Sequence, residues 1–247
     1  MDLTDLLIIV VAIALGSFIK GVTGSGLPQI AIPVMAIFLG VERSVVVMAI
    51  PGIVSNTWLM WTYRAHLGGA RDLPVLLSTG IVGAVGGTWL LKELDPRILS
   101  GVLAAIILSY ILLRSTRPSF ALSPWLSRKL SPPVGLAAGT LQGATGISGP
   151  LLTTYLHSYR LDPKVYVVSL VTLFQVFAVV QGITMVGLGL FDRSRVVEGL
   201  LALLPMMIAL PLGARIGRYL SATVFDRWIL VLLVGSAAKL VHGAIWG

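Results

Sequence analysis

Residues 143–150, Gly-Ala-Thr-Gly-Ile-Ser-Gly-Pro, interrupt an otherwise apolar region of the chain. Three glycines and a proline in so short a segment disfavour a continuous helix, because glycine loses much backbone entropy and proline lacks an N–H donor. In a membrane, non-helical backbone is tolerated only where protein covers it or water reaches it. The segment is therefore expected to be a broken helix inside a membrane protein.

A second segment, residues 21–28, Gly-Val-Thr-Gly-Ser-Gly-Leu-Pro, has the same chemistry. The two segments match at one constant offset along the chain, which pairs Gly21 with Gly143, Thr23 with Thr145, Gly24 with Gly146 and Pro28 with Pro150. Two broken helices in corresponding positions of two halves are the best sequence indication of a transporter's binding site.

The composition is that of a membrane protein. Of the 247 residues 56% are hydrophobic and 11% are charged, whereas soluble domains have about a quarter charged residues. Cysteine is absent, which excludes disulfides, thiol nucleophiles and cysteine-bound metals. The net charge of +8 comes from basic residues scattered between apolar runs, which is typical of topology-setting charges at lipid headgroups rather than of nucleic-acid binding. No basic segment precedes the first apolar run, so a cleaved signal peptide is not expected.

The apolar runs predict how the chain is organised. Runs of spanning length, about 17–25 residues, are expected at residues 44–63, 73–91, 98–113, 165–190, 196–213 and 228–246, and the glycine segments lie in the regions 5–40 and 133–158. We predict an all-α integral membrane protein with two inverted repeats, each a broken or re-entrant helical hairpin followed by three transmembrane helices. The first repeat covers residues 1–115, a connector covers 116–131 and the second repeat covers 132–247. Two Gly-Ala-x-x-Gly segments, residues 83–87 and 213–217, align the halves, and their small residues also favour close helix packing.

The topology depends on whether the broken elements cross the membrane. If they cross, the basic residues of the loops are shared equally between the two sides. If each is a re-entrant hairpin, the repeats are inverted and most of these basic residues fall on one side, in agreement with the positive-inside rule. The hairpin arrangement is preferred, and it places both termini outside.

The glycine segments offer hydrogen-bond donors to an anion. Where a helix restarts after a break, its first N–H groups are unpaired and its dipole end is positive, so two such ends in the middle of the membrane would form an anion site. The alternative interpretation is that the segments are kinks or close helix crossings without a ligand. The expected substrate-binding residues are Lys20, Gly21, Thr23, Gly24, Ser25, Gly26, Gln142, Gly143, Thr145, Gly146, Ser148, Gly149, Asn56 and Gln175.

The remaining polar residues of the expected spans have less specific roles. Lys20, the counterpart of Gln142, is either a counter-charge for an anion or extends to an aqueous vestibule. Asn56, Gln175 and Gln181 are amides inside expected spans that could reach the ligand, although an interhelical hydrogen bond is the more common role. All ten acidic residues lie at or near the ends of apolar runs, so no carboxylate of a typical proton or sodium site is expected within a span.

The glycine segments, the chain length and the paired Gly-Ala-x-x-Gly segments resemble the TauE/SafE sulfite exporter family, also called the 4-toluene sulfonate uptake permease superfamily. The resemblance covers nearly the whole chain, and its motif residues correspond to Gly21, Thr23, Gly24, Gly26 and Pro28, then to Gly143, Thr145, Gly146, Gly149 and Pro150. It implies a multi-pass transporter of the bacterial inner membrane for sulfite, sulfonates such as sulfoacetate or toluenesulfonate, and related organic anions. Lys20 opposite Gln142 departs from a symmetric pair of segments.

The expected function is transport of small sulfur oxyanions or organosulfonates by alternating access around a site in the middle of the membrane. A small anion and the lipid bilayer are the expected partners, with no nucleic acid, no cofactor, no metal and no catalytic residues. Two alternatives stay open. One is a transporter of another small organic anion such as a carboxylate, and the other is a membrane accessory protein without transport activity.

Overall fold

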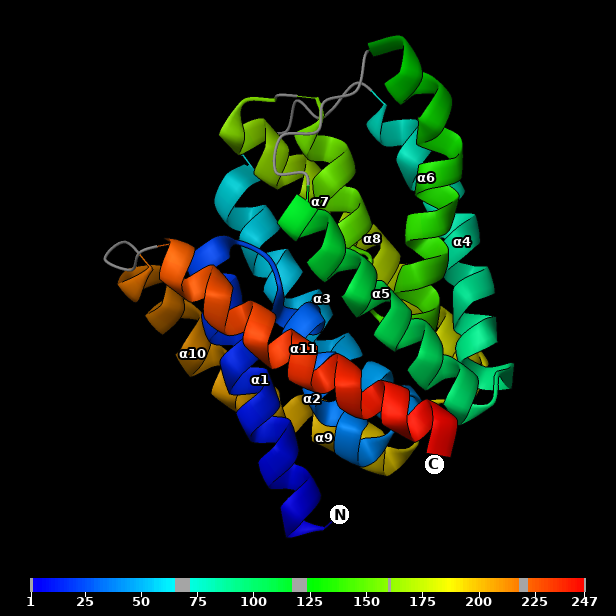
Figure 1. Ribbon diagram of the computed structural model, residues 1–247, viewed down its shortest axis with the longest axis vertical. Coiled ribbons are helices and arrows are strands. Elements are labelled where there is room, and N and C mark those ends of the chain that lie inside the picture. The colour runs from blue at the N-terminus through cyan, green and yellow to red at the C-terminus, as the bar shows by residue number, and fades with distance from the viewer. Residues whose placement is uncertain (1, 65–71, 117–123, 160, 218–221, 247) are drawn as a thin grey trace. The chain divides into compact units, whose positions relative to one another are not determined.

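The computed structural model describes residues 2–64, 72–116, 124–159, 161–217 and 222–246. All regular structure in these ranges is α-helical, which confirms the predicted all-α class. The helices (Figure 1) are α1 (Leu3–Thr23), α2 (Leu27–Leu39), α3 (Val41–Tyr63), α4 (Leu73–Glu93), α5 (Pro96–Thr116), α6 (Pro124–Thr145), α7 (Gly149–His157), α8 (Pro163–Gly187), α9 (Arg193–Leu201), α10 (Leu203–Ile216) and α11 (Ala222–Trp246).

The lengths of the apolar helices agree with a multi-pass membrane protein. Five segments among the described residues are long and apolar enough to cross a bilayer, namely Leu3–Thr23, Val41–Thr62, Leu73–Glu93, Pro163–Gly187 and Arg193–Ile216. The runs expected at 44–63, 73–91 and 165–190 correspond to α3, α4 and α8. The run expected at 98–113 corresponds to α5, and the run at 228–246 lies within α11.

Two of the differences from the predicted boundaries occur at prolines. Helix α6 begins at Pro124, within the expected connector, because a proline is favourable in the first turn, where its missing N–H has no helical partner. The run expected at 196–213 is two helices, since α9 ends at Leu201 and α10 begins at Leu203. Pro205 cannot donate to the Leu201 carbonyl, which accounts for this interruption.

The chain forms two compact units that do not coincide with its two halves. Unit 1 comprises Met1–Pro51, Leu94–Thr116 and Phe191–Gly247, and unit 2 comprises Gly52–Glu93 and Arg117–Leu190. Each unit therefore takes helices from both halves of the sequence. The division into repeats at residues 1–115 and 132–247 stays a prediction.

Within unit 1, glycines bring α1 and α10 into close backbone contact. Gly21 of α1 lies against the carbonyl of Leu210 and the N–H of Ala214, and Gly213 of α10 lies against the carbonyl of Phe18. A Cβ atom at either glycine would overlap with these backbone atoms. These two positions therefore require glycine for helix packing.

Within unit 2, α6 and α4 repeat this packing, and they lie alongside each other in Figure 1. Gly143 lies against the carbonyl of Ala84 and the N–H of Thr88, and Gly87 lies against the carbonyl of Thr140. Thr140 corresponds to Phe18, because the same spacing along the chain separates these two residues as separates Gly143 from Gly21. The structural counterpart of Gly213 is therefore Gly87, and the alignment of residues 83–87 with 213–217 was wrong by one helical turn.

Both glycine segments are turns between two helices that fold back on each other. Helix α1 ends at Gly24, with φ of 79°, and Gly16 of α1 lies against Leu27 and Ala31 of α2. Helix α6 is followed by Gly146, with φ of 69°, and Tyr155 of α7 returns to hydrogen-bond Ser131 of α6 at 2.8 Å. The breaks are where the sequence predicts them. The second arms, of 13 and 9 residues, are too short to span a bilayer.

Candidate functional site

The second glycine segment, in unit 2, is held by three buried polar side chains. Ser148 donates its hydroxyl proton to Gln142 Oε1 at 2.9 Å, and Gln142 Nε2 donates to Gln181 Oε1 at 3.1 Å. Gln181 Nε2 in turn donates to the carbonyls of Gln142 and Gly143, at 2.7 and 3.1 Å. These bonds connect α8 to both arms of the α6–α7 hairpin.

The threonines of the two segments hold the turns in the same way. Thr145 Oγ1 donates to the Leu141 carbonyl at 2.7 Å and accepts from the N–H of Ile147 at 3.4 Å. Thr23 Oγ1 lies 2.7 Å from the Ser25 carbonyl and 3.0 Å from the Ile19 carbonyl, one of which accepts its proton, and it accepts from the N–H of Ser25 at 3.3 Å. The hydroxyls of Thr23 and Thr145, two residues of the predicted binding site, are thus used within the turns.

The first segment, in unit 1, differs from the second in exposure and in its polar side chains. Gly24 and Gly26 both have positive φ, at 79° and 102°, and the segment is partly exposed, whereas the second is buried. Lys20, in the last turn of α1, is only 3% exposed. A cation in the last turn of a helix is favoured by the helix dipole.

The helices that restart after the glycine segments have uncapped N-termini. Helices α1, α8 and α9 begin in the usual way, because the carboxylates of Asp2, Asp162 and Asp192 accept hydrogen bonds from first-turn N–H groups. Helix α2 begins after Gly26 and helix α7 after Ser148, and neither residue makes a side-chain cap bond. The first N–H groups of these two helices are therefore available to another acceptor.

The other amides of the predicted site lie elsewhere in unit 2. Gln175 of α8 donates to Thr57 of α3 at 2.9 Å, and its Oε1 atom is buried without a partner in the described part of the chain. Asn56 is buried in α3. The amide of this group that contacts a glycine segment is Gln181, and its bonds to Gln142 and Gly143 are the interhelical hydrogen bonds that the sequence favours for it. Gln181 lies six residues after Gln175 and therefore on a different side of α8. Which of these two sides faces α6 depends on how the helices pack.

The sequence of the chain matches a known family. The family model described as Sulfite exporter TauE/SafE matches residues 8–240. The chain belongs to this family. No curated protein and no solved structure matches it. The TauE/SafE family implies a membrane transporter of sulfur anions such as sulfite, and the apolar helices make this member a multi-pass membrane protein.

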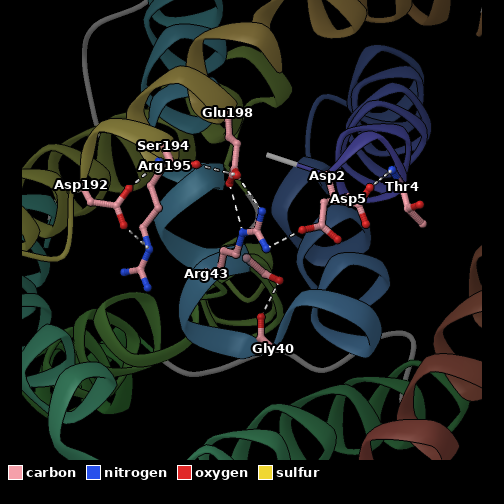
Figure 2. Close-up of polar contacts among 10 residues, drawn as sticks. Asp2, Thr4, Asp5, Gly40, Arg43, Asp192, Ser194, Arg195 and Glu198 are labelled. Atoms are coloured by element: carbon pink, nitrogen blue, oxygen red, sulfur yellow. Dashed lines mark hydrogen bonds and ion pairs between the residues drawn. The ribbon is translucent and has the colours of Figure 1, made fainter.

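In unit 1, this TauE/SafE chain contains an ion-pair network around one buried carboxylate, which sequence reasoning missed (Figure 2). The carboxylate of Glu198 on α9 is fully buried and accepts hydrogen bonds from Arg43 Nη2 at 2.6 Å and Nε at 3.1 Å. Arg43 Nη1 also contacts Asp5 Oδ2 at 2.7 Å, and Ser194 donates to Glu198 at 3.2 Å. The sequence shows these residues near the ends of apolar runs but carries no signal that pairs positions so far apart.

Unit 2 of this TauE/SafE chain has a buried carboxylate at the corresponding position. Asp72 and Glu198 are separated by the same offset as Gly87 and Gly213. Asp72 Oδ2 accepts a hydrogen bond from the Tyr159 hydroxyl at 2.7 Å, and the Tyr159 hydroxyl oxygen lies 2.8 Å from that of Tyr155. Burial raises the pKa of the Tyr159 hydroxyl, which keeps it protonated as a donor. In each unit, one buried carboxylate thus anchors the open end of the hairpin, which is the end opposite the glycine turn.

Proposed function

We propose that the chain moves small sulfur oxyanions or organosulfonates, such as sulfite, sulfoacetate or toluenesulfonate, across the bacterial inner membrane. The observation that carries the proposal is the pair of uncapped helix N-termini, one after each glycine segment. A helix N-terminus binds anions because its N–H groups and its dipole both favour negative charge. A sulfonate has several acceptor oxygens and no donor, and it suits such a site.

The proposed binding residues are those of the two segments together with two amides of unit 2. The glycines that are not packed against a neighbouring helix let an oxyanion approach the backbone, since any side chain would hold it away from the amides. Lys20 supplies positive charge and Ser25 a hydroxyl donor in the first segment. The full set is Lys20, Gly21, Thr23, Gly24, Ser25, Gly26, Gln142, Gly143, Thr145, Gly146, Ser148, Gly149, Asn56 and Gln175.

We also propose the re-entrant topology, in which neither hairpin crosses the membrane and both termini lie outside. In unit 1, Asp5 at the start of α1 pairs with Arg43 at the start of α3, which supports a hairpin that returns to the side from which it enters. In unit 2, Lys92 at the end of α4 donates to the Leu188 carbonyl at the end of α8, at 3.0 Å. A crossing α6–α7 hairpin would put these two helix ends on opposite sides of the membrane.

The transport step is proposed to be alternating access. The closest backbone contacts join α1 of the first half to α10 of the second, and α4 of the first half to α6 of the second. A rocking of one sequence half against the other would break these contacts. The bodies that move are therefore proposed to be the two compact units, each of which keeps its glycine packing intact.

A thermal-shift experiment on the purified protein tests the substrate class, because a ligand that binds only the folded state raises its apparent stability. We expect sulfite, sulfoacetate and toluenesulfonate to raise Tm in a concentration-dependent way and acetate to have little effect. Stabilisation by acetate alone would favour the carboxylate alternative. Stabilisation by none of the four, together with no sulfite flux in proteoliposomes, would favour the accessory protein.

Gly149→Leu is the matched variant for this experiment. The side chain would cover the first-turn N–H groups of α7, so we expect the sulfite-induced shift to disappear while the protein still inserts. Gly187→Leu serves as the control, because the space around Gly187 is open for a side chain. An undiminished sulfite shift in Gly149→Leu would remove the second segment from the site.

A further inference from the structure

We propose that Gln181 and Gln142 are positioning residues, which keep the N-terminus of α7 open for the anion by preventing Ser148 from capping it. The inference rests on the proposed function. It gives Gln142 and Ser148 a supporting role in the site, and it adds Gln181, which was not among the predicted binding residues.

The first step is that Ser148 does not cap the helix that it precedes. Serine is one of the best N-cap residues, because its hydroxyl accepts a hydrogen bond from a first-turn N–H while its own backbone is in the β region. Ser148 precedes α7 but has a helical backbone, with φ of −109° and ψ of −10°, and makes no side-chain cap bond. Its hydroxyl instead donates to Gln142 Oε1 at 2.9 Å.

The second step is the orientation of the Gln142 amide. An amide presents its oxygen to Ser148 only if its nitrogen points the other way, and Gln142 Nε2 donates to Gln181 Oε1 at 3.1 Å. Gln181 is fixed in turn, because its nitrogen donates to the Gln142 and Gly143 carbonyls. All three side chains are at most 7% exposed, so water does not compete strongly for these hydrogen bonds.

The third step is a comparison with the first segment. Gly26 occupies the position that corresponds to Ser148, and it is the N-cap residue of α2. Glycine has no hydroxyl and cannot cap a helix through a side chain. Both restarting helices thus have uncapped N-termini, one because the side chain is missing and the other because the side chain is held away.

The experiment measures the Kd of the purified protein for sulfite in Gln142→Leu and Gln181→Leu. In both variants the Ser148 hydroxyl is released, so the residue is free to turn its backbone to the β region and cap α7, and one donor to the anion is then lost. We expect Kd to rise about tenfold, since a hydrogen bond to a charged group contributes on the order of the free energy of a tenfold change. Thr184→Val, a change on α8 that removes only a hydroxyl bonded to its own helix, is the control and should keep the wild-type Kd.

A second substitution separates positioning from a general structural role. Adding Ser148→Gly to either variant removes the competing hydroxyl and reproduces the residue found at position 26. We expect the wild-type Kd to return to within about twofold, although the hydrogen bonds of Gln142 or Gln181 are still missing. A purely structural role predicts a further loss of affinity.

The outcomes distinguish this inference from the proposed function. Wild-type affinity in both single variants, or no recovery in the double variants, overturns the positioning role. Absence of sulfite binding to the wild-type protein overturns the proposed function itself. Because Gln142 and Gln181 lie on different helices, failure of one variant to fold leaves the other, with its own double variant, as the test.

Discussion

Lys20 and Gln142 occupy equivalent positions in the two glycine segments, but their chemistry differs. Gln142 is neutral, and both ends of its amide are engaged by Gln181 and Ser148. Lys20 is a basic side chain buried in the last turn of an apolar helix. A buried cation in a membrane protein is costly and is retained mainly for function. In the proposed function, the first segment is therefore expected to contribute charge and the second a preformed geometry.

Lys20→Met is expected to weaken sulfite binding more than Gln142→Leu. The methionine removes a charge, whereas the leucine at position 142 costs only the one N–H donor of α7 that Ser148 then caps. We expect a rise in Kd of about a hundredfold or less, with unliganded Tm unchanged or higher, since a buried charge is costly to desolvate. Titration of both variants by thermal shift measures the difference. Lys20→Arg, which keeps the charge, is the control, and equal losses in the methionine and leucine variants would reduce Lys20 to a vestibule residue.

At this scale the sequence predicts the residue types of the site better than their roles. The glycine positions follow from a repeated pattern that no regular helix tolerates. The roles of Thr23, Thr145 and Ser148 follow from local geometry, because a hydroxyl can either bind a ligand or hold the adjacent turn. The importance of Gln181 over Gln175 depends on which side of α8 faces α6. One sequence contains no information on that rotation.

Among the helices, the open ends of the two hairpins are anchored by different chemistry at equivalent positions. Glu198 is held by the guanidinium of Arg43, and Asp72 by the hydroxyl of Tyr159. The ion pair joins α9 to α3 and, through Asp5, to α1. An unpaired charge at a fully buried position costs far more than an exposed one. The Arg43 network should therefore fix the start of α1 and, with it, the arm that ends at Lys20.

Arg43→Met is expected to destabilise the protein by about 3–5 kcal/mol, because it leaves the carboxylate of Glu198 buried without a cation. The double variant Arg43→Met/Glu198→Met should recover much of this loss, since it removes the uncompensated charge. Thermal denaturation in detergent measures both effects. Arg195→Met, which breaks a more exposed pair with Glu42, should cost about 0–1 kcal/mol. Similar losses in the two single variants would contradict the assignment of Glu198 as a buried, paired charge.

The element boundaries illustrate where sequence patterns stop being informative. Long apolar runs locate α3, α4 and α8 because burial in lipid requires continuous hydrophobicity. The polar stretch before residue 133 was expected to be a connector, yet α6 begins at Pro124, since proline and serine also start helices. The alignment of Gly83 with Gly213 failed because two glycines one turn apart both fit the pattern, and only packing distinguishes Gly87.

For the whole molecule, the proposed re-entrant topology makes a prediction that labelling can test. The natural chain has no cysteine, so single cysteines are introduced without a background. In intact cells, a membrane-impermeant maleimide should label Lys92→Cys, whereas Lys164→Cys and Arg215→Cys should be labelled only after the membrane is opened. Crossing hairpins would place all three positions on one side. Arg160, which also distinguishes the two topologies, lies outside the described residues.

The interleaving of the two halves has a mechanical consequence that a disulfide can test. Gly101 of α5 and Ala244 of α11 belong to different halves of the sequence but to the same compact unit. A Cβ atom at Gly101 would lie 3.9 Å from Ala244 Cβ, which fits the Cβ separation of a disulfide, about 3.5–4.5 Å. If the units move as bodies, Gly101→Cys/Ala244→Cys should carry sulfite at the same rate in proteoliposomes whether oxidised or reduced. If the halves move instead, oxidation should stop the flux and a reductant should restore it, while each single cysteine variant stays insensitive to both treatments.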